Sequence, residues 1–372
     1  MKVSATFCLV LAIWVTPAKS EEPVVLKFER YEMRGEPYGF LPEHFAVTPE
    51  NTWLVNNITS LLDFYPDGTL KAELELPPEG KMEIVSFAFI PRERVYVVCV
   101  KDQEKDDDPF QILAYDEQET LLGISSFQKG GEEVSYFRQM MVTNYDEIFI
   151  NVWEPDYKKI VEPPMLQKLA IHETKGGYAL SLVGQPFSRQ LRESRRFEFN
   201  FKKKWLVEKE LDVPVIFVAD ELQPRIMRYE EIGDGEYSDE EVCSLELAGW
   251  RGTHTYPEKR GFVPMNRWYF SFSKTVGFFE LERGFLLAYQ NPNDSYDWDG
   301  LTTPNLFQHG TAPFSLTLQP LDDHCRMVEK ATEVPGFSFL MGTYGDVGYV
   351  FSLIQGEENR YRVESISFGG TL

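Results

Sequence analysis

The stretch FAVTPENTWLVNNITSLLDFYPDGTL, from Phe45 to Leu70, contains four short apolar runs separated by turn-forming residues. A Thr48–Asn51 segment separates the first two runs, Asn56-Asn57 ends the second, and Asp67-Gly68 precedes the fourth. Pro, Asn, Asp and Gly favour turns because of their φ preferences and their side-chain hydrogen bonds to the backbone. The stretch is therefore predicted to form four consecutive short strands.

Similar alternations of apolar runs and turns recur along the chain. They occur at 85–117, 140–171 and 215–229, with a spacing of roughly 45 to 65 residues that suits propeller blades carrying loop insertions. Two further units, at about 260–320 and 334–370, are assigned by length and bring the number to six. We predict an all-β protein with a single six-bladed β-propeller domain over residues 24–372. The alternative is a pair of β-sandwich domains, because strand spacing separates the two architectures only loosely.

The fourth unit carries a more specific pattern. Asp220 ends an apolar strand, and Arg225-Ile226 follows after Pro224. This order resembles the strand, aspartate, corner and Arg-Ile strand of NHL-type repeats, and the first unit, with Asp67-Gly68, is similar to the repeats of NHL and SMP-30-like six-bladed propellers. The resemblance implies a ligand in the central funnel, lined by residues at the ends of the inner strands.

The same resemblance suggests a metal site. SMP-30-like lactonases hold one calcium ion in the funnel with a glutamate, asparagines and an aspartate, and the positions that match here are Asn56, Asn151 and Asp220. The Asn-Gly and Asp-Gly pairs that precede the inner strands of that family are missing, with Ser86-Phe87 and Gln139-Met140 in about those places. The competing interpretation is that the three polar residues end strands and begin turns.

The N-terminal residues predict export. Met1-Lys2, an apolar run from Val3 to Val15 and the small-residue triplet that ends at Ser20 form the pattern of a signal peptide over residues 1–20. The apolar run has about 13 residues, fewer than the roughly 20 needed to span a bilayer, so no membrane span is expected. The protein is therefore expected to be extracellular, with glycosylation sequons at Asn57 and Asn293.

Three cysteines remain after removal of such a peptide. Cys99 lies in a continuous apolar run and is predicted to be a buried thiol, which leaves Cys243 with Cys325 as the one pairing we consider for a disulfide.

The charge and the motifs limit the possible functions. The chain has 37 Lys and Arg against 59 Asp and Glu, a formal net charge of −22, which disfavours nucleic acid and anionic membranes as partners. A basic, aromatic segment at 189–205 could dock an anionic glycan or protect an edge strand. No Gly-x-Ser-x-Gly elbow or zinc spacing is present.

Two functions are compatible with these patterns. The first is a monomeric binding or interaction protein without a cofactor, which holds an extracellular protein, a glycan or a small molecule. The second is a calcium-dependent lactone or ester hydrolase of the SMP-30-like type. The missing catalytic motifs favour the first, and fold analogy alone favours the second.

Overall fold

The computed structural model describes eighteen segments of the chain, and the structural statements below refer to them. They are residues 23–27, 45–57, 60–77, 82–102, 111–126, 128–129, 132–133, 137–143, 147–152, 167–174, 177–183, 204–210, 213–233, 236–238, 241–252, 262–299, 311–353 and 360–368. The predicted signal peptide, residues 1–20, and the basic residues 189–203 lie outside them.

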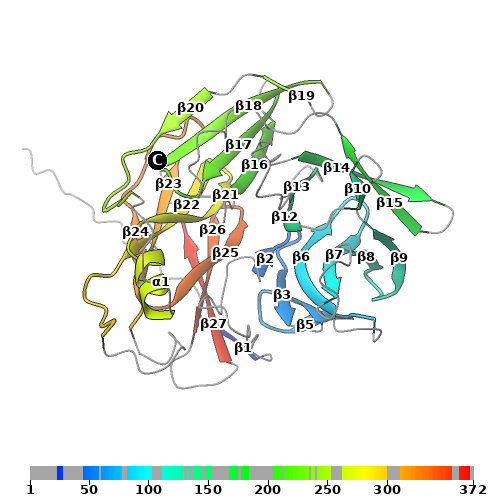
Figure 1. Ribbon diagram of the computed structural model, residues 1–372, viewed down its shortest axis with the longest axis horizontal. Coiled ribbons are helices and arrows are strands. Elements are labelled where there is room, and N and C mark those ends of the chain that lie inside the picture. Colours follow the sequence, from blue (N-terminus) through cyan, green and yellow to red (C-terminus); the bar gives the residue numbers. More distant parts are fainter. Residues whose placement is uncertain are drawn as a thin grey trace, which may run out of the picture.

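The strands form six antiparallel sheets arranged as the blades of a β-propeller (Figure 1). The first three blades follow one another in chain order. Blade 1 comprises β2 (Phe45–Val47), β3 (Trp53–Asn57), β4 (Ser60–Phe64) and β5 (Leu70–Glu75). Blade 2 comprises β6 (Met82–Ile90), β7 (Val95–Asp102), β8 (Gln111–Asp116) and β9 (Leu121–Ser126). Blade 3 comprises β12 (Phe137–Val142), β13 (Ile148–Val152), β14 (Gln167–Thr174) and β15 (Gly177–Val183).

The second half of the ring continues in the same order. Blade 4 comprises β16 (Lys204–Glu210), β17 (Pro214–Asp220), β18 (Arg225–Gly233), β19 (Glu236–Tyr237) and β20 (Glu241–Ser244). Blade 5 comprises β21 (Lys274–Leu281), β22 (Gly284–Pro292), β23 (Phe314–Leu321) and β24 (Thr332–Val334). Blade 6 comprises β25 (Ser338–Tyr344), β26 (Val347–Leu353), β27 (Arg360–Ser367) and, from the N-terminal end, β1 (Val24–Lys27). A hairpin of β10 (Gln128–Lys129) and β11 (Glu132–Glu133) follows blade 2, and α1 (Phe262–Tyr269) precedes blade 5.

Each blade buries both of its faces, which explains the continuous apolar runs in the sequence. In β7, Tyr96 and Val98 pack toward blade 1, whereas Val97 and Cys99 pack toward blade 3. The described apolar residues accordingly form six clusters, one at each junction between neighbouring blades. A strand that is buried on both faces has no polar face, so its sequence is a continuous run of apolar residues and not an alternation of apolar and polar ones. Cys99 is fully buried, as its position in such a run predicts.

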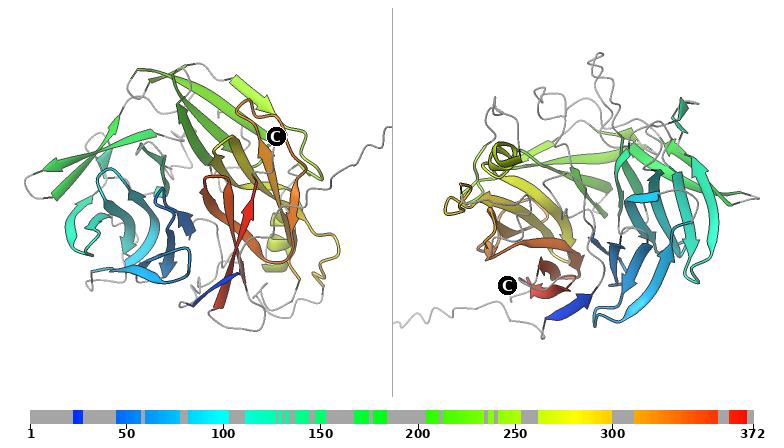
Figure 2. Two further views of the ribbon diagram at one scale, coloured as in Figure 1. Left: turned by 180° about the vertical axis from the view of Figure 1, so that it is seen from behind. Right: turned by 60° about the horizontal axis from the view of Figure 1, so that its bottom comes forward.

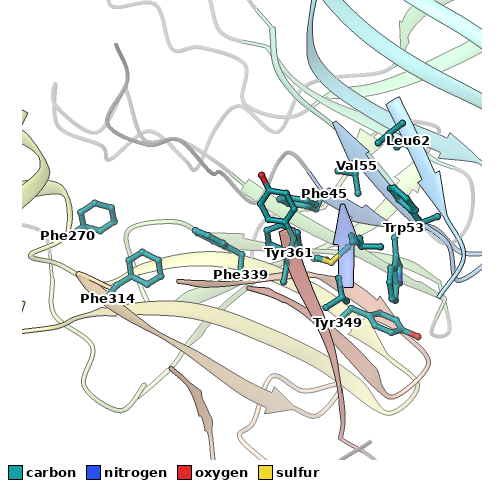
Figure 3. Close-up of a cluster of buried hydrophobic side chains, with 14 of the residues drawn as sticks. Phe45, Trp53, Val55, Leu62, Phe270, Phe314, Phe339, Tyr349 and Tyr361 are labelled. Carbon is teal, nitrogen blue, oxygen red and sulfur yellow. The ribbon is translucent and has the colours of Figure 1, made fainter. Parts of the chain in front are cut away.

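The ring is closed by β1, which pairs with β27 as the outermost strand of blade 6 (Figure 2). The first and last parts of the chain therefore share one sheet. At the junction of blades 6 and 1, the ring centroids of Phe45 and Phe351 lie 4.0 Å apart. The ring of Trp53 meets that of Tyr349 edge-on, with their centroids 5.2 Å apart (Figure 3). Leu26 of β1 belongs to the same cluster, so the terminal strand contributes apolar burial as well as hydrogen bonds.

The predicted turn at Asp67-Gly68 takes part in this closure. Gly68 has a φ of +83°, and Asp67 Oδ1 accepts a hydrogen bond from Thr69 N at 2.8 Å. A β carbon at residue 68 would lie 2.6 Å from Val24 Cγ1, so the turn packs against β1 in a way that only glycine allows.

The structure confirms the six-bladed propeller rather than two sandwiches, and it corrects the boundaries of two blades. Blade 5 extends over 274–334 rather than about 260–320. The fourth blade begins at β16, not at Val215, so Lys204-Trp205 starts the innermost strand of that blade. In the described residues, α1 is too short and too polar to cross a membrane.

A pair of substitutions in β1 tests the closure. Leu26 is 1% exposed and Val25 is 52% exposed. We expect Leu26→Ala to reduce the free energy of unfolding by about 2–4 kcal/mol, because it leaves a cavity in the closing cluster. We expect Val25→Ala to change it by less than about 0.5 kcal/mol. Urea titration of the two variants measures both values, and equal effects would contradict a sealing role for β1.

Candidate functional site: the central cavity

The first strand of every blade faces the axis of the ring, and together these six strands line a cavity of about 620 Å³. The strands are β2, β6, β12, β16, β21 and β25. A volume of this size lies within the range of pockets that hold small molecules. The site is therefore assembled from segments that span 45–345 of the chain.

The wall of the cavity combines apolar and polar surface in similar amounts, and its polar groups gather near the ends of the inner strands. Apolar residues of all six blades line it, including Phe45, Phe87, Met140, Leu206, Phe278 and Met341. The side chains of Phe45, Phe278 and Met341 pack in the clusters between the blades. The polar residues include Thr48, Thr143, Glu208, Glu280, Glu282 and Thr343. An apolar cavity with a few convergent polar groups is the usual form of a small-molecule site.

Glu208 is the most buried carboxylate of the cavity. Its side chain lies on β16 toward blade 3 and is 6% exposed, and its Oε2 accepts a hydrogen bond of 2.6 Å from Thr143 Oγ1. Burial raises the pKa of Glu208, and the Thr143 hydroxyl partly offsets this. A carboxylate in this position is costly to ionise unless a donor or a cation accompanies it.

The charges around Glu208 are predominantly negative. Glu147 and Glu231 raise its pKa further, whereas Lys168 lowers it. Lys168 Nζ already forms ion pairs with Glu147 at 2.9 Å and Glu231 at 3.5 Å. Three carboxylates thus share one nearby ammonium group, which leaves local negative charge beside the cavity.

Two other lysines near the inner strands have partners away from Glu208. Lys209, the next residue on β16, faces blade 5, where its Nζ donates to Asp323 Oδ1 at 2.5 Å. Lys274 begins β21, is 1% exposed, and donates to the carbonyl oxygen of Tyr269 at 2.5 Å, beneath the ring of the same tyrosine. Burial lowers the pKa of Lys274 to about 7. Lys274 anchors the end of α1 and is not a cavity-lining residue.

The calcium ligands suggested by the resemblance have separate surroundings. Asn56 is buried and donates from Nδ2 to the Ile84 carbonyl of blade 2 at 3.1 Å. Asp220 is buried; its Oδ1 accepts from Leu222 N, and its Oδ2 accepts from the Arg225 guanidinium at 3.1 and 3.2 Å. The pattern that resembled an NHL repeat is thus an aspartate–arginine pair across one turn.

These residues also lie on different blades. Asn56 and Asp220 belong to blades 1 and 4, on opposite sides of a ring of six. Asn151 lies on β13 of blade 3, and its side chain is outside the described part. Among the described residues, no group of three or more His, Cys, Asp or Glu side chains is arranged to hold a metal ion.

The remaining predicted positions have defined places in the fold. Both sequon asparagines are half-buried: Asn57 Nδ2 donates to Ser60 Oγ at 3.2 Å and Asn293 Nδ2 donates to the Ala312 carbonyl at 2.8 Å. Cys243 and Cys325 are free thiols in this structure, and both pack in the apolar cluster at the junction of blades 4 and 5.

Glu208 was not identified from the sequence. It follows the basic segment that we interpreted as a docking patch or an edge strand, and charge dominates that stretch. The usable signal was the apolar Trp205-Leu206-Val207 directly before it, at the spacing expected for an inner strand ahead of β17.

Comparison with known proteins identifies the class of protein as a six-bladed β-propeller and no more. A member of the DUF4221 family from Bacteroides vulgatus is similar in structure with a TM-score of 0.60 and 10% identity, over 93% of this chain and 96% of that one. A gluconolactonase from Xanthomonas campestris has a TM-score of 0.41 and 12% identity, over 87% and 85% of the two chains. A virginiamycin B lyase from Staphylococcus aureus has a TM-score of 0.41 and 8% identity, over 93% and 99%. No protein-family model and no curated protein matches the sequence.

The raised pKa of Glu208 predicts a pH-dependent cost in stability. The folded protein holds the Glu208 proton to higher pH than the unfolded chain, so its stability falls as pH rises through the interval between the two pKa values. We expect Glu208→Gln, which still accepts from Thr143, to match the wild type near pH 4 and to melt a few degrees higher at pH 8. Thermal melts across this range check the difference, and a lower melting temperature of the variant at pH 8 would contradict it.

Proposed function

We propose that the protein is an extracellular binding protein that holds a small amphipathic ligand in the central cavity. The ligand has an apolar body, which packs against the aromatic and methionine wall, and a cationic or hydrogen-bond-donating group that pairs with Glu208. The cavity with one buried carboxylate at its wall is the observation that carries this proposal. The extracellular location rests on the pattern of residues 1–20.

The electrostatic surroundings support a cation rather than an anion. Glu147 and Glu231 lie beside Glu208 and both pair with Lys168, Glu282 lies exposed at the same cavity, and the whole chain carries a formal charge of −22. A negative field around a cleft draws cationic solutes and repels anionic ones. Desolvation by the apolar wall makes the pairing of a bound ammonium group with Glu208 stronger than it would be in water.

The wall itself favours a binding role. Thr143 Oγ1 is already a donor to Glu208, and the hydroxyl of Thr343 donates to the Glu280 carbonyl at 2.6 Å. The backbone carbonyl that accepts from Thr343 cannot act as a general base, whereas Glu208, which accepts from Thr143, is a carboxylate that could. The hydrolase alternative has its proposed ligand Asp220 engaged by Arg225 on one oxygen and by a backbone amide on the other.

Binding can be tested with probes of matched shape and different charge. We expect phenylbutylamine to raise the melting temperature saturably, and phenylbutyrate and phenylbutanol to have much weaker effects. Glu208→Gln should reduce the affinity for the amine about tenfold or more in titration calorimetry, which is the loss expected for a charge-assisted hydrogen bond. Glu282→Gln, which changes an exposed carboxylate at the same cavity, is the matched control and should reduce the affinity for the amine by less than about threefold. Equal binding of the amine and the carboxylate probe, or no effect of Glu208→Gln, would refute the proposal.

Calcium distinguishes the two functions. We expect calcium to leave the melting temperature of the wild type unchanged. Asp220→Asn should lower it in the presence and absence of calcium alike, because the variant leaves the Arg225 guanidinium without its charged partner. A calcium-dependent rise in the wild type that vanishes in Asp220→Asn would favour the hydrolase instead.

A further inference from the structure

The junction of blades 4 and 5 brings together two cysteines that are far apart in the sequence. Cys243 lies on β20, the outer strand of blade 4, opposite Ile226 of β18. Cys325 lies in the turn after β23 of blade 5 and belongs to the apolar cluster of this junction, against which Cys243 packs. Cys243 is close enough to Cys325 to raise the pKa of the Cys325 thiol, in addition to the effect of burial.

The backbone at Cys325 is unusual for a cysteine. Its φ is +58°, in the left-handed region where glycine and asparagine are the common residues. Asn51, Arg94 and Glu119 adopt the same left-handed φ in other turns between consecutive strands of this chain, so the conformation belongs to the turn type. The direction of the Cys325 side chain is therefore set by the turn and not by the preference of the residue itself.

The turn is held in place by a dense set of hydrogen bonds. Asp322 Oδ1 accepts from His324 N at 2.9 Å and from Arg326 N at 2.8 Å, and Asp322 Oδ2 accepts from Arg326 Nε at 2.8 Å. The backbone nitrogen of Cys325 donates to the Asp322 carbonyl at 2.9 Å. These bonds fix Cys325 relative to blade 5.

A second contact fixes the same turn relative to blade 4. Lys209 Nζ of β16 is within 2.5 Å of Asp323 Oδ1, and the lysine side chain is mostly buried between the two blades. Blade 4 therefore contacts the turn through its inner strand as well as through Cys243. The position of Cys325 beside Cys243 does not depend on the cysteines alone.

We propose that Cys243 and Cys325 form a disulfide that joins blade 4 to blade 5 when the protein enters an oxidising compartment. Formation of this disulfide does not depend on what the central cavity binds. Cys243 is half-buried and reachable from solvent, whereas Cys325 is buried and burial raises its pKa. Cys243 is accordingly the thiol that reacts first with an external oxidant.

The chemistry requires a small disulfide oxidant, such as oxidised glutathione. The Cys243 thiolate attacks one sulfur of the oxidant, a mixed disulfide forms, and one glutathione thiolate leaves. Cys325 loses its proton to solvent and attacks the Cys243 sulfur, and the second glutathione thiolate leaves. Overall the two protein thiols are oxidised to one disulfide, and oxidised glutathione is reduced to two glutathione molecules.

The bond should stabilise the ring. It would connect two blades through a loop of many residues, and closing a long loop restricts the unfolded chain strongly. Cys99 supplies an internal control, because its thiol is fully buried between blades 2 and 3 and has no cysteine partner in the described residues.

The test uses the full chain equilibrated with oxidised glutathione, then alkylated and digested without reduction. We expect a linked pair of peptides that contain Cys243 and Cys325, two hydrogen atoms lighter than the separate thiols, with Cys99 alkylated only after denaturation. Oxidation should raise the melting temperature by about 5 °C or more. This rise should disappear in Cys243→Ser and persist in Cys99→Ala.

Three results would overturn the proposal. They are full alkylation of Cys243 and Cys325 after equilibration with the oxidant, a stable glutathione adduct on Cys243 with no linked peptide, and a disulfide between separate chains. The peptide measurement is made on the wild type, so it stands even where a variant folds poorly.

Discussion

The pairing of β1 with β27 is the contact on which the rest of the ring depends. Each blade has two apolar faces, and a linear row of such blades would leave one face of blade 1 and one face of blade 6 in water. The cluster around Phe45, Trp53 and Phe351 covers both of those faces at once. Because β1 and β27 come from opposite ends of the described chain, closure joins the ends of the sequence in one sheet.

The central cavity is a consequence of this closure. In every blade the first strand is a sheet edge, and six edges that meet around one axis enclose a space that none of them could form alone. The faces of the blades bury the larger side chains, so the inner strands are free to carry polar residues at their ends. Glu208 and its neighbour Lys209 lie on opposite faces of β16: Glu208 contributes to the cavity wall from the blade 3 side, and Lys209 points into the junction with blade 5.

Electrostatics distinguishes this cavity from a merely apolar gap. Lys209 and Lys274 are buried, and their ammonium groups are bonded to partners within the blades. Around Glu208, the carboxylates of Glu147 and Glu231 raise its pKa and the ammonium group of Lys168 lowers it. Burial raises the pKa of a carboxylate, and ionising that carboxylate near neutral pH then reduces the stability of the folded protein. Such costs are common at sites that serve binding or catalysis. This supports a cationic partner.

The sequence by itself determined the β class, the turn at Asp67-Gly68 and the buried state of Cys99, because these follow from local backbone preferences and from runs that must be buried on both faces. It also indicated the repeating unit, since each blade requires a similar order of strands and turns. It did not place the start of blade 4, because the charges before β16 masked the apolar pattern of an inner strand. Elimination of Cys99 had left Cys243 and Cys325 as the one pairing to consider, and the tertiary structure placed both at one blade junction. Only the tertiary structure decided that β1 completes blade 6 and that Glu208 lines a cavity. Each of these depends on contacts between segments far apart in the chain, and local sequence carries no record of which distant segment a strand will meet.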